Sequence, residues 1–234
     1  MSAPPLRVRH EGAVAWLTLD RPARHNALTL ELLEALGAAL AAVVAGATAR
    51  VVVVSGAGPS FCSGADLVET AALVAGADRD DYLRRTFAVL RTLDELPLPT
   101  IAAVHGHVLA GGCELAMVCD LVVAGIDAVF GLPETELGML PVVALTRGRA
   151  RPAPGVLARM VLAGDRLDAP QALRAGLADV LAPAGEHLAE AARLAEAIAE
   201  RDATAVAEAT ALMRAAPDDA AALAAAARTM GMPR

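Results

Sequence analysis

The sequence contains no lysine, and all 20 of its basic residues are arginine. Schiff-base catalysis, a lysine general base and a Walker-type phosphate loop each require a lysine, so these mechanisms are excluded. Cysteine is also scarce: Cys62, Cys113 and Cys119 are an odd number without the CxxC or Cys/His spacing of a metal site. We therefore expect buried free thiols, with no disulfide framework and no metal centre.

Aromatic side chains make up only 2% of the chain, and no block of basic residues offsets its formal net charge of -7. Proteins that hold nucleic acid usually offer stacking platforms and a positively charged groove, so we expect no nucleic-acid partner. The apolar runs are too short to span a bilayer, and the opening MSAPPLRVRHEG has no hydrophobic signal core. A cytosolic protein that does not bind membranes is predicted.

Aliphatic residues are abundant instead: the 234 residues are 56% hydrophobic, which is enough for one main domain with a sizeable core. Strand-like and helix-like segments alternate, and this pattern predicts an α/β fold with mainly parallel strands. Beyond Pro154 the pattern predicts helices to the end of the chain. The expected strands are 6–10, 14–19, 51–55, 100–104, 121–124 and 128–131, with helices from near Thr29 to just before Gly46, over about 80–96 and around Glu114.

The stretch from Thr100 to Asp120 places one carboxylate, Glu114, in an otherwise apolar segment that follows two glycines. Apolar residues occupy every helical face around it, so a helix here would be buried on all sides. A buried, unpaired carboxylate is costly or takes a strongly raised pKa. From the spacing alone, an ion-paired structural glutamate and a functional one are equally acceptable interpretations.

Two loops follow buried strands and lead towards helices: GAGPSFCSGAD after residues 51–55, and HGHVLAGG after residues 100–104. In an open α/β sheet both lie at the carboxyl ends of strands, where ligands usually bind. Gly111 and Gly112 would place free amides at a helix N-terminus, which is the arrangement of an oxyanion hole.

A dinucleotide-binding turn is a weaker alternative for the first of these loops, Gly56-Ala57-Gly58. Phe61 stands where the third glycine should be, and Pro59 stands where the helix should begin. The chain has no GxSxG motif, and its 5 histidines lack metal-binding spacing.

Four motifs together resemble the crotonase superfamily, the enoyl-CoA hydratase/isomerase family, and they occur in the family's order. They are RP with NAL at residues 21–28, VVVVSGAGPSFCSGADL, IAAVHGHVLAGGCELAMVCDLVVA and FGLPETELGMLP, and the resemblance covers roughly residues 6–182. It implies a crotonase-like spiral of repeated ββα units over residues 1–182 and a helical C-terminal region over 183–234, shortened relative to the family. It also implies a homotrimer or a dimer of trimers.

The resemblance also implies a site. Ala65 and Gly111 match the two positions whose backbone amides form the family's oxyanion hole, and Glu114 and Glu134 match its two catalytic glutamates. Neither a metal nor a separate cofactor is implied, because coenzyme A is part of the acyl-CoA substrate. The residues implied in substrate binding are Ser63, Ala65, Asp66, Leu67, Gly111 and Arg24.

The presence of both glutamates favours hydration of an enoyl-CoA thioester, or the reverse dehydration, through an enolate stabilised by the oxyanion hole. The alternatives are an enoyl-CoA isomerase, a decarboxylase or thioester hydrolase on the same scaffold, and a catalytically silent acyl-CoA-binding assembly subunit. One segment departs from the family: VVALTRGRARPAPG follows Pro141 in place of a glycine-rich GxGGT turn. We expect this departure to alter the acyl pocket.

Overall fold

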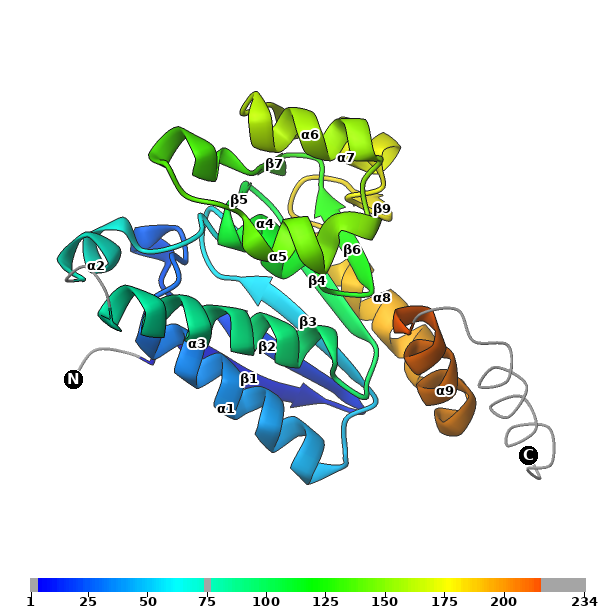
Figure 1. Ribbon diagram of the computed structural model, residues 1–234. Helices are drawn as coiled ribbons and strands as arrows, with labels where there is room; N and C mark the ends of the chain where they lie inside the picture. Colours follow the sequence, from blue (N-terminus) through cyan, green and yellow to red (C-terminus); the bar gives the residue numbers. More distant parts are fainter. Residues whose placement is uncertain (1–3, 74–76, 216–234) are drawn as a thin grey trace.

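The computed structural model describes residues 4–73 and 77–215, and a six-stranded sheet forms its centre (Figure 1). The strands lie in the order β1-β2-β3-β4-β6-β9, and all neighbouring pairs are parallel except β1 with β2. The predicted α/β class with mainly parallel pairing is therefore confirmed. The strands are β1 Leu6–Glu11, β2 Val14–Leu19, β3 Val51–Gly56, β4 Thr100–Val104, β6 Leu121–Gly125 and β9 Val180–Ala182.

A second, three-stranded sheet is built from β5 His107–Leu109, β7 Val129–Gly131 and β8 Arg166–Asp168. The prediction that the chain is helical throughout beyond Pro154 is wrong, because β8 and β9 lie there. The sequence also showed only a loop where β5 forms. These strands have three residues each, too few for an alternating pattern, and they are defined by pairing with neighbours distant in the sequence.

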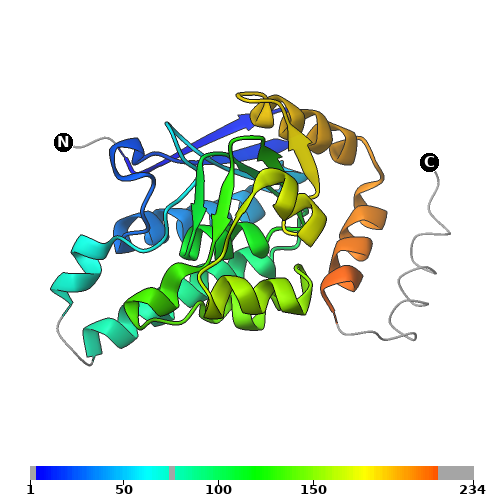
Figure 2. The same ribbon diagram turned by 90° about the horizontal axis from the view of Figure 1, so that it is seen from above.

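Helices cover both faces of the central sheet, because side chains alternate between the two faces along each strand. Helices α1 Leu30–Gly46 and α3 Ala77–Asp94 pack on one face, against residues such as Leu17 and Val54. Helix α8 His187–Ala199 packs on the other face (Figure 2), in a separate apolar cluster.

Helix α1 begins after a threonine cap and ends before a left-handed residue that is not glycine. The side chain of Thr29 accepts a hydrogen bond from the Leu32 amide at 3.2 Å, as the predicted start near Thr29 suggests. At the other end Gly46 was expected just past the helix, but Gly46 is its last residue and Ala47 adopts the left-handed conformation, with φ 50.

Short helices complete the fold. No helix of the described part of the chain is long and apolar enough to cross a membrane. Helices α8 and α9 fall within the predicted C-terminal region, whereas the end of that region lies outside the described residues. The division into two domains at residue 182 stays a prediction.

The remaining helices are η1 Pro22–Arg24, α2 Leu67–Ala72, α4 Gly111–Met117, η2 Pro133–Leu137, α5 Val142–Thr146, η3 Gly148–Ala150, α6 Pro154–Leu162, α7 Ala169–Ala175 and α9 Ala203–Arg214.

Candidate active site

The amides of Ala65 and Gly111 lie close together although the residues come from different loops. A Cβ atom built on Gly111 would lie 4.0 Å from the Ala65 nitrogen. Ala65 forms a bridge to Leu28 that uses the carbonyl of Gly64 and the amide of Asp66, so its own N–H points away from that strand. Neither amide of the pair donates a hydrogen bond to any described residue. The pair is thus free to bind an oxygen of a ligand.

Close packing between the two loops holds this amide pair in place. Gly64 has φ +94, and a Cβ atom on it would lie 2.6 Å from the Cβ of Ala110 and 3.2 Å from the Gly111 nitrogen. On Gly112 a Cβ atom would lie 2.3 Å from the Cys62 carbonyl oxygen. Glycine is therefore required at both positions, because either side chain would push the loops apart.

A strained residue begins the helix that carries Gly111. Ala110 precedes α4 with φ 49 and ψ -129, a conformation that residues with a side chain rarely adopt. Its own amide donates to the Gly131 carbonyl at 2.9 Å, which fixes the residue on the second sheet. Backbone strain of this kind is typical of functional sites and costs about 1–3 kcal/mol.

The first motif, with Arg21 and Asn26, supports the loop that contains Ala65. The side-chain Nδ2 of Asn26 donates hydrogen bonds to the main-chain carbonyls of Ala57 and Ser60, at 2.9 and 2.8 Å. Nη2 of Arg21 donates to the carboxylate of Asp66 at 3.0 Å. The sequence showed Arg21 and Asn26 only as parts of a motif, and their contacts are what position the amide of Ala65.

The carboxylate of Asp66 is used within the loop. It caps α2 by accepting hydrogen bonds from the amides of Val68 and Glu69, and it also binds Arg21. Burial alone would raise its pKa, but the Arg21 hydrogen bond and the two amides together lower it. Its main chain is used within the loop as well, because the amide donates to the Leu28 carbonyl and the carbonyl accepts a hydrogen bond from the Thr70 amide.

The other predicted binding residues are Ser63, Arg24 and Leu67. The Ser63 amide donates to the His25 carbonyl at 3.0 Å, which brings Ser63 beside η1 and its last residue, Arg24. Arg24 is exposed, and Leu67 is 55% exposed. A cation and an apolar side chain thus face solvent on residues that flank the loop of Ser63 and Ala65.

Glu114 lies in the first turn of α4 and is 7% exposed, as its apolar surroundings predicted. Among the described residues it has no ion-pair partner, so this part of the chain gives no support to the interpretation as an ion-paired structural glutamate. Its Oε1 atom accepts hydrogen bonds from the amides of Val143 and Ala144 at 2.8 and 2.9 Å. Burial raises the pKa of Glu114, and the two amides oppose this rise.

The amides that hold Glu114 come from the segment that departs from the family pattern. Val143 and Ala144 lie in the first turn of α5, which begins directly after Pro141. Their side chains are buried, so this short helix is packed in place. The sequence gave no sign of the contact, because hydrogen bonds from main-chain amides leave no residue signature.

Glu134 lies in η2 and is also 7% exposed. Neither of its carboxylate oxygens has a hydrogen-bond partner among the described residues. Burial first, and then the charge of Glu114, raise the pKa of Glu134 to about 7. The structure therefore places the two predicted glutamates near each other, with Glu134 poised to exchange a proton near neutral pH.

Similarity to known proteins extends over most of the chain. A family model described as Enoyl-CoA hydratase/isomerase matches residues 9–232. The chain belongs to the enoyl-CoA hydratase/isomerase family.

Members of this family from distant organisms are similar to it. The 2,3-dehydroadipyl-CoA hydratase of Escherichia coli (strain K12) is 40% identical over 195 residues, which are 83% of this chain and 75% of that protein. The mitochondrial enoyl-CoA hydratase of Pongo abelii is 36% identical over 187 residues, or 80% of this chain and 63% of that protein.

Solved structures of the family confirm the crotonase-like fold. The crystal structure of enoyl-CoA hydratase from Mycobacterium smegmatis is similar with a TM-score of 0.92 and 31% identity, over 99% of this chain and 93% of that one. For the enoyl-CoA hydratase of Bacillus anthracis the TM-score is 0.88 at 30% identity, over 96% and 88% of the two chains.

Proposed function

We propose that this enzyme adds water to the double bond of an enoyl-CoA thioester, or catalyses the reverse dehydration. The observation that supports the proposal most strongly is the pair of buried glutamates, Glu114 and Glu134, together with the amides of Ala65 and Gly111. Within the described part of the chain the glutamates have no cation partner and the amides have no acceptor. In a purely structural site these costly groups would be paired.

In the proposed mechanism the amides of Ala65 and Gly111 bind the oxygen of the thioester carbonyl. Negative charge develops on this oxygen when water adds to the β-carbon and an enolate forms. Preorganised amide donors stabilise that charge, and each is worth about 10²–10³ in rate.

The two carboxylates divide the proton transfers. Oε1 of Glu114 is held by two amides, which leaves Oε2 to orient the water and take its proton. Glu134 has no such donors in the described part of the chain, so it holds the proton when the pair binds only one. It then donates that proton to the α-carbon of the enolate, and in the dehydration direction it removes it.

The test is incubation of the purified enzyme with crotonyl-CoA and with longer or branched enoyl-CoAs, following the loss of the conjugated thioester absorbance. Glu114→Gln and Glu134→Gln are each expected to lower kcat by about 10²–10⁴. Unchanged turnover in both variants would sink the mechanism. A product with a shifted double bond would support an isomerase, release of carbon dioxide or free coenzyme A a decarboxylase or hydrolase, and saturable coenzyme A binding without turnover a silent subunit.

We also propose that the enzyme needs neither a metal nor a separate cofactor, because the two carboxylates supply the proton transfers and coenzyme A belongs to the substrate. Turnover that survives dialysis against EDTA supports this. Cytosolic location stays a prediction.

A homotrimer or a dimer of trimers is proposed for the assembly. Apolar side chains on η2, α6 and the loop before α5 support it: Leu137, Leu140 and Leu162 are 59%, 66% and 81% exposed. Exposed apolar residues gathered on neighbouring elements often mark protein interfaces. Light scattering coupled to gel filtration tests the assembly, and a monomeric mass would contradict it.

A further inference from the structure

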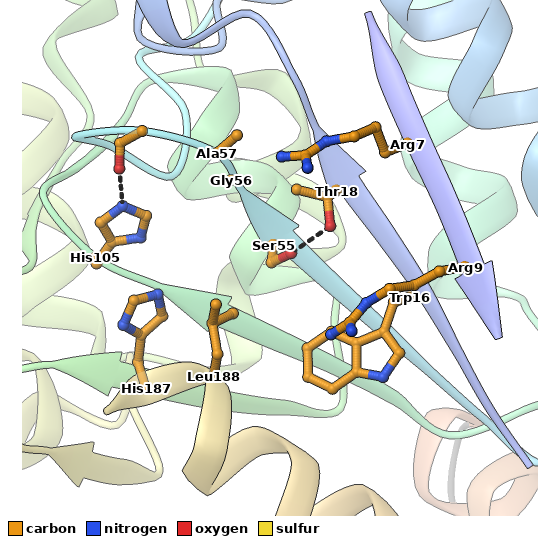
Figure 3. Close-up of a pocket in the computed structure, with 11 residues that line it drawn as sticks. Arg7, Arg9, Trp16, Thr18, Ser55, Gly56, Ala57, His105, His187 and Leu188 are labelled. Atoms are coloured by element: carbon orange, nitrogen blue, oxygen red, sulfur yellow. Dashed lines mark hydrogen bonds between the residues drawn. The ribbon is translucent and has the colours of Figure 1, made fainter. Parts of the chain in front are cut away.

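A hollow of about 410 Å³ lies on the face of the central sheet that α8 covers only in part (Figure 3). Neither Glu114 nor Glu134 lines it. Its floor is formed where β2 and β3 end, at Thr18 and Ser55, whose hydroxyls share a hydrogen bond of 3.0 Å. The ends of parallel strands are a usual place for ligands, and the proposed reaction does not use this one.

Two histidines with unsatisfied nitrogens stand on one side of the hollow. The rings of His105 and His187 are stacked, with centroids 4.4 Å apart. Nε2 of His105 donates to the Gly58 carbonyl at 2.7 Å, whereas its Nδ1 has no partner among the described residues. His187 is only 6% exposed, and both of its nitrogens lack a partner there. Buried polar atoms without partners call for an explanation such as a ligand.

The N-terminus of α8 is uncapped at the same place. His187 and Leu188, the first two residues of this 13-residue helix, line the hollow. Glu186 stands at the N-cap but its side chain makes no capping hydrogen bond. The amides of His187, Leu188 and Ala189 donate to no described residue. Such a helix end carries partial positive charge and binds anions.

Arg7 supplies a cation from the opposite side. It extends from β1 over the hollow in Figure 3, and its Nε is paired with Asp20 at 2.7 Å. Its terminal nitrogens have no partner among the described residues. Arg9 also lines the hollow, but its Cζ lies 4.6 Å from the centroid of the Trp16 ring and its guanidinium pairs with Glu11, so it is already engaged.

We propose that this hollow binds a phosphate-sized oxyanion, either inorganic phosphate or the phosphate of a small phosphomonoester. The donors are the terminal nitrogens of Arg7, the first amides of α8 and a ring N–H of His187. They come from different sides of the hollow, which suits a tetrahedral anion better than a planar carboxylate.

The charge state of His187 is compatible with this role. Burial and then His105 lower the pKa of His187 to about 4, against the opposing influence of the Asp127 carboxylate. The ring is therefore neutral at pH 7 and offers one N–H donor.

The test is isothermal titration calorimetry on the full chain with inorganic phosphate, glycerol 3-phosphate and acetate, at an ionic strength held constant with sodium chloride. We expect saturable binding of phosphate, of glycerol 3-phosphate, or of both, and the preferred probe identifies the source of the anion. Arg7→Gln is expected to raise Kd by about 10- to 100-fold and His187→Gln by about 3- to 10-fold. Arg85→Gln, an exposed arginine on α3, is the matched control and should leave Kd unchanged.

The proposal would be overturned by no saturable binding of either phosphate probe, by acetate binding as tight as phosphate, or by unchanged affinity in both Arg7→Gln and His187→Gln. Displacement of the bound phosphate by coenzyme A would also overturn it, because the anion would then occupy the coenzyme site. Arg7 is exposed, so its variant is expected to fold. The enoyl-CoA assay on the same preparations is independent, so a failed hydratase proposal and a failed anion site are distinguishable.

Discussion

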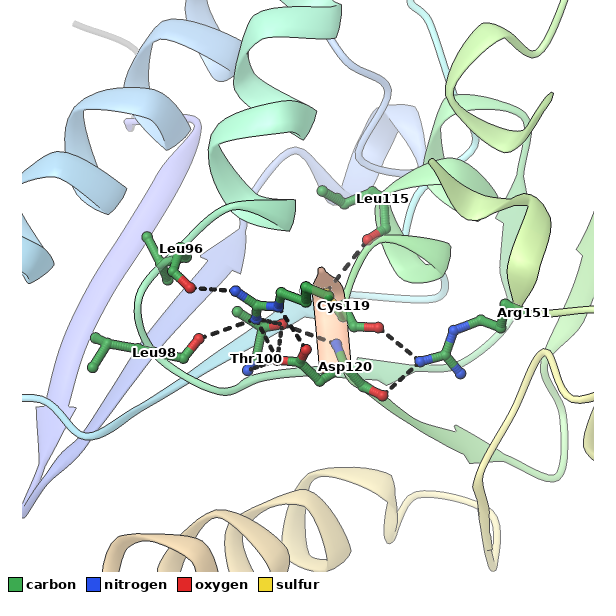
Figure 4. A network of polar contacts seen from close by, with 8 residues as sticks. Leu96, Leu98, Thr100, Leu115, Cys119, Asp120 and Arg151 are labelled. Atoms are coloured by element: carbon green, nitrogen blue, oxygen red, sulfur yellow. Dashed lines mark hydrogen bonds and ion pairs between the residues drawn. The ribbon is translucent and has the colours of Figure 1, made fainter. Parts of the chain in front are cut away.

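Two carboxylate centres near the β4–β6 part of the central sheet are built in opposite ways. Where β4 and β6 begin, Asp120 binds Arg214 and also accepts hydrogen bonds from the Thr100 amide and hydroxyl at 2.7 and 2.9 Å (Figure 4). In the candidate active site, Glu134 has no hydrogen-bond partner among the described residues. Asp120 is thus a fully paired anchor, whereas Glu134 keeps its polar atoms unsatisfied.

The Asp120 centre ties distant parts of the chain together. Arg214 is the last residue of α9, and it also donates to the carbonyls of Leu96 and Leu98 just before β4. Arg151 donates to the main-chain carbonyls of Cys119 and Asp120 at 2.7 Å each. The difference between the centres teaches that partners, more than burial, separate a structural carboxylate from a reactive one.

The largest expected effect is on activity in the Glu134 centre. Glu134→Gln should lower kcat for enoyl-CoA hydration by about 10²–10⁴, because the proton donor to the α-carbon is lost. Its free energy of unfolding should stay equal or rise, because a poorly solvated charge is removed. Steady-state kinetics and urea unfolding measure the two quantities. Glu136→Gln, an exposed glutamate in the same short helix, is the matched control and should change neither.

The reverse result is expected in the Asp120 centre. Asp120→Asn should lower the free energy of unfolding by about 3 kcal/mol, because the Arg214 guanidinium loses its counter-charge. The kcat of the folded protein should stay unchanged. Arg193→Gln, which breaks an exposed pair with Glu190 on α8, should leave the free energy of unfolding nearly unchanged, because solvent screens that pair. A stable Asp120→Asn protein with lost activity would reverse the assignment of the two centres.

Loop packing beside the amide pair gives the next effect. Gly64→Ala should lower kcat by about tenfold or more, because the new Cβ would meet Ala110 at 2.6 Å and displace the Ala65 amide. Gly12→Ala is the control: Gly12 also has a positive φ, +54, but nothing lies within 4 Å of a Cβ there. It should cost about 1 kcal/mol of stability through backbone strain alone. Equal kinetics in the two variants would contradict the role of the amide pair.

The smallest expected effect is a dependence on pH. Because the pKa of Glu134 is raised to about 7, hydration should slow by up to tenfold per pH unit above that value as the proton donor is lost. The free energy of unfolding should also depend on pH. Between pH 4.5 and 7 the Glu134 carboxyl is protonated in the folded state and ionised in the unfolded state. Its contribution to the free energy of unfolding therefore falls as pH rises through this range. The difference between the wild-type and Glu134→Gln unfolding curves isolates this contribution, and a flat difference would contradict the raised pKa.

The sequence predicted the parts of the fold that show strong local patterns. The β-branched run of β3 and the strand β4 were found with nearly their observed bounds, and Glu114 was expected to be buried. The short strands β8 and β9 were missed, because their stability comes from neighbouring strands and their three residues carry little pattern.

The candidate site was predicted in the same uneven way. The four central residues of the site could be named because the chain resembles a family, and the structure brings the two amides together and the two glutamates near each other. The hydrogen bonds from the α5 amides to Glu114 could not be predicted, because main-chain donors leave no residue pattern in the sequence. The role of Asp120 could not be predicted from the sequence, because its partner Arg214 lies 94 residues further along the chain.

Because Glu114 is held by main-chain amides, the side chains of the segment that holds it can change without loss of the two hydrogen bonds. Val142 and Leu145 flank the two donating residues in α5, and their side chains are 44% and 40% exposed. Substitutions at these two positions alter the surface around the glutamate without removing either amide. A segment without a glycine-rich turn therefore still anchors the carboxylate of Glu114, through main-chain groups alone.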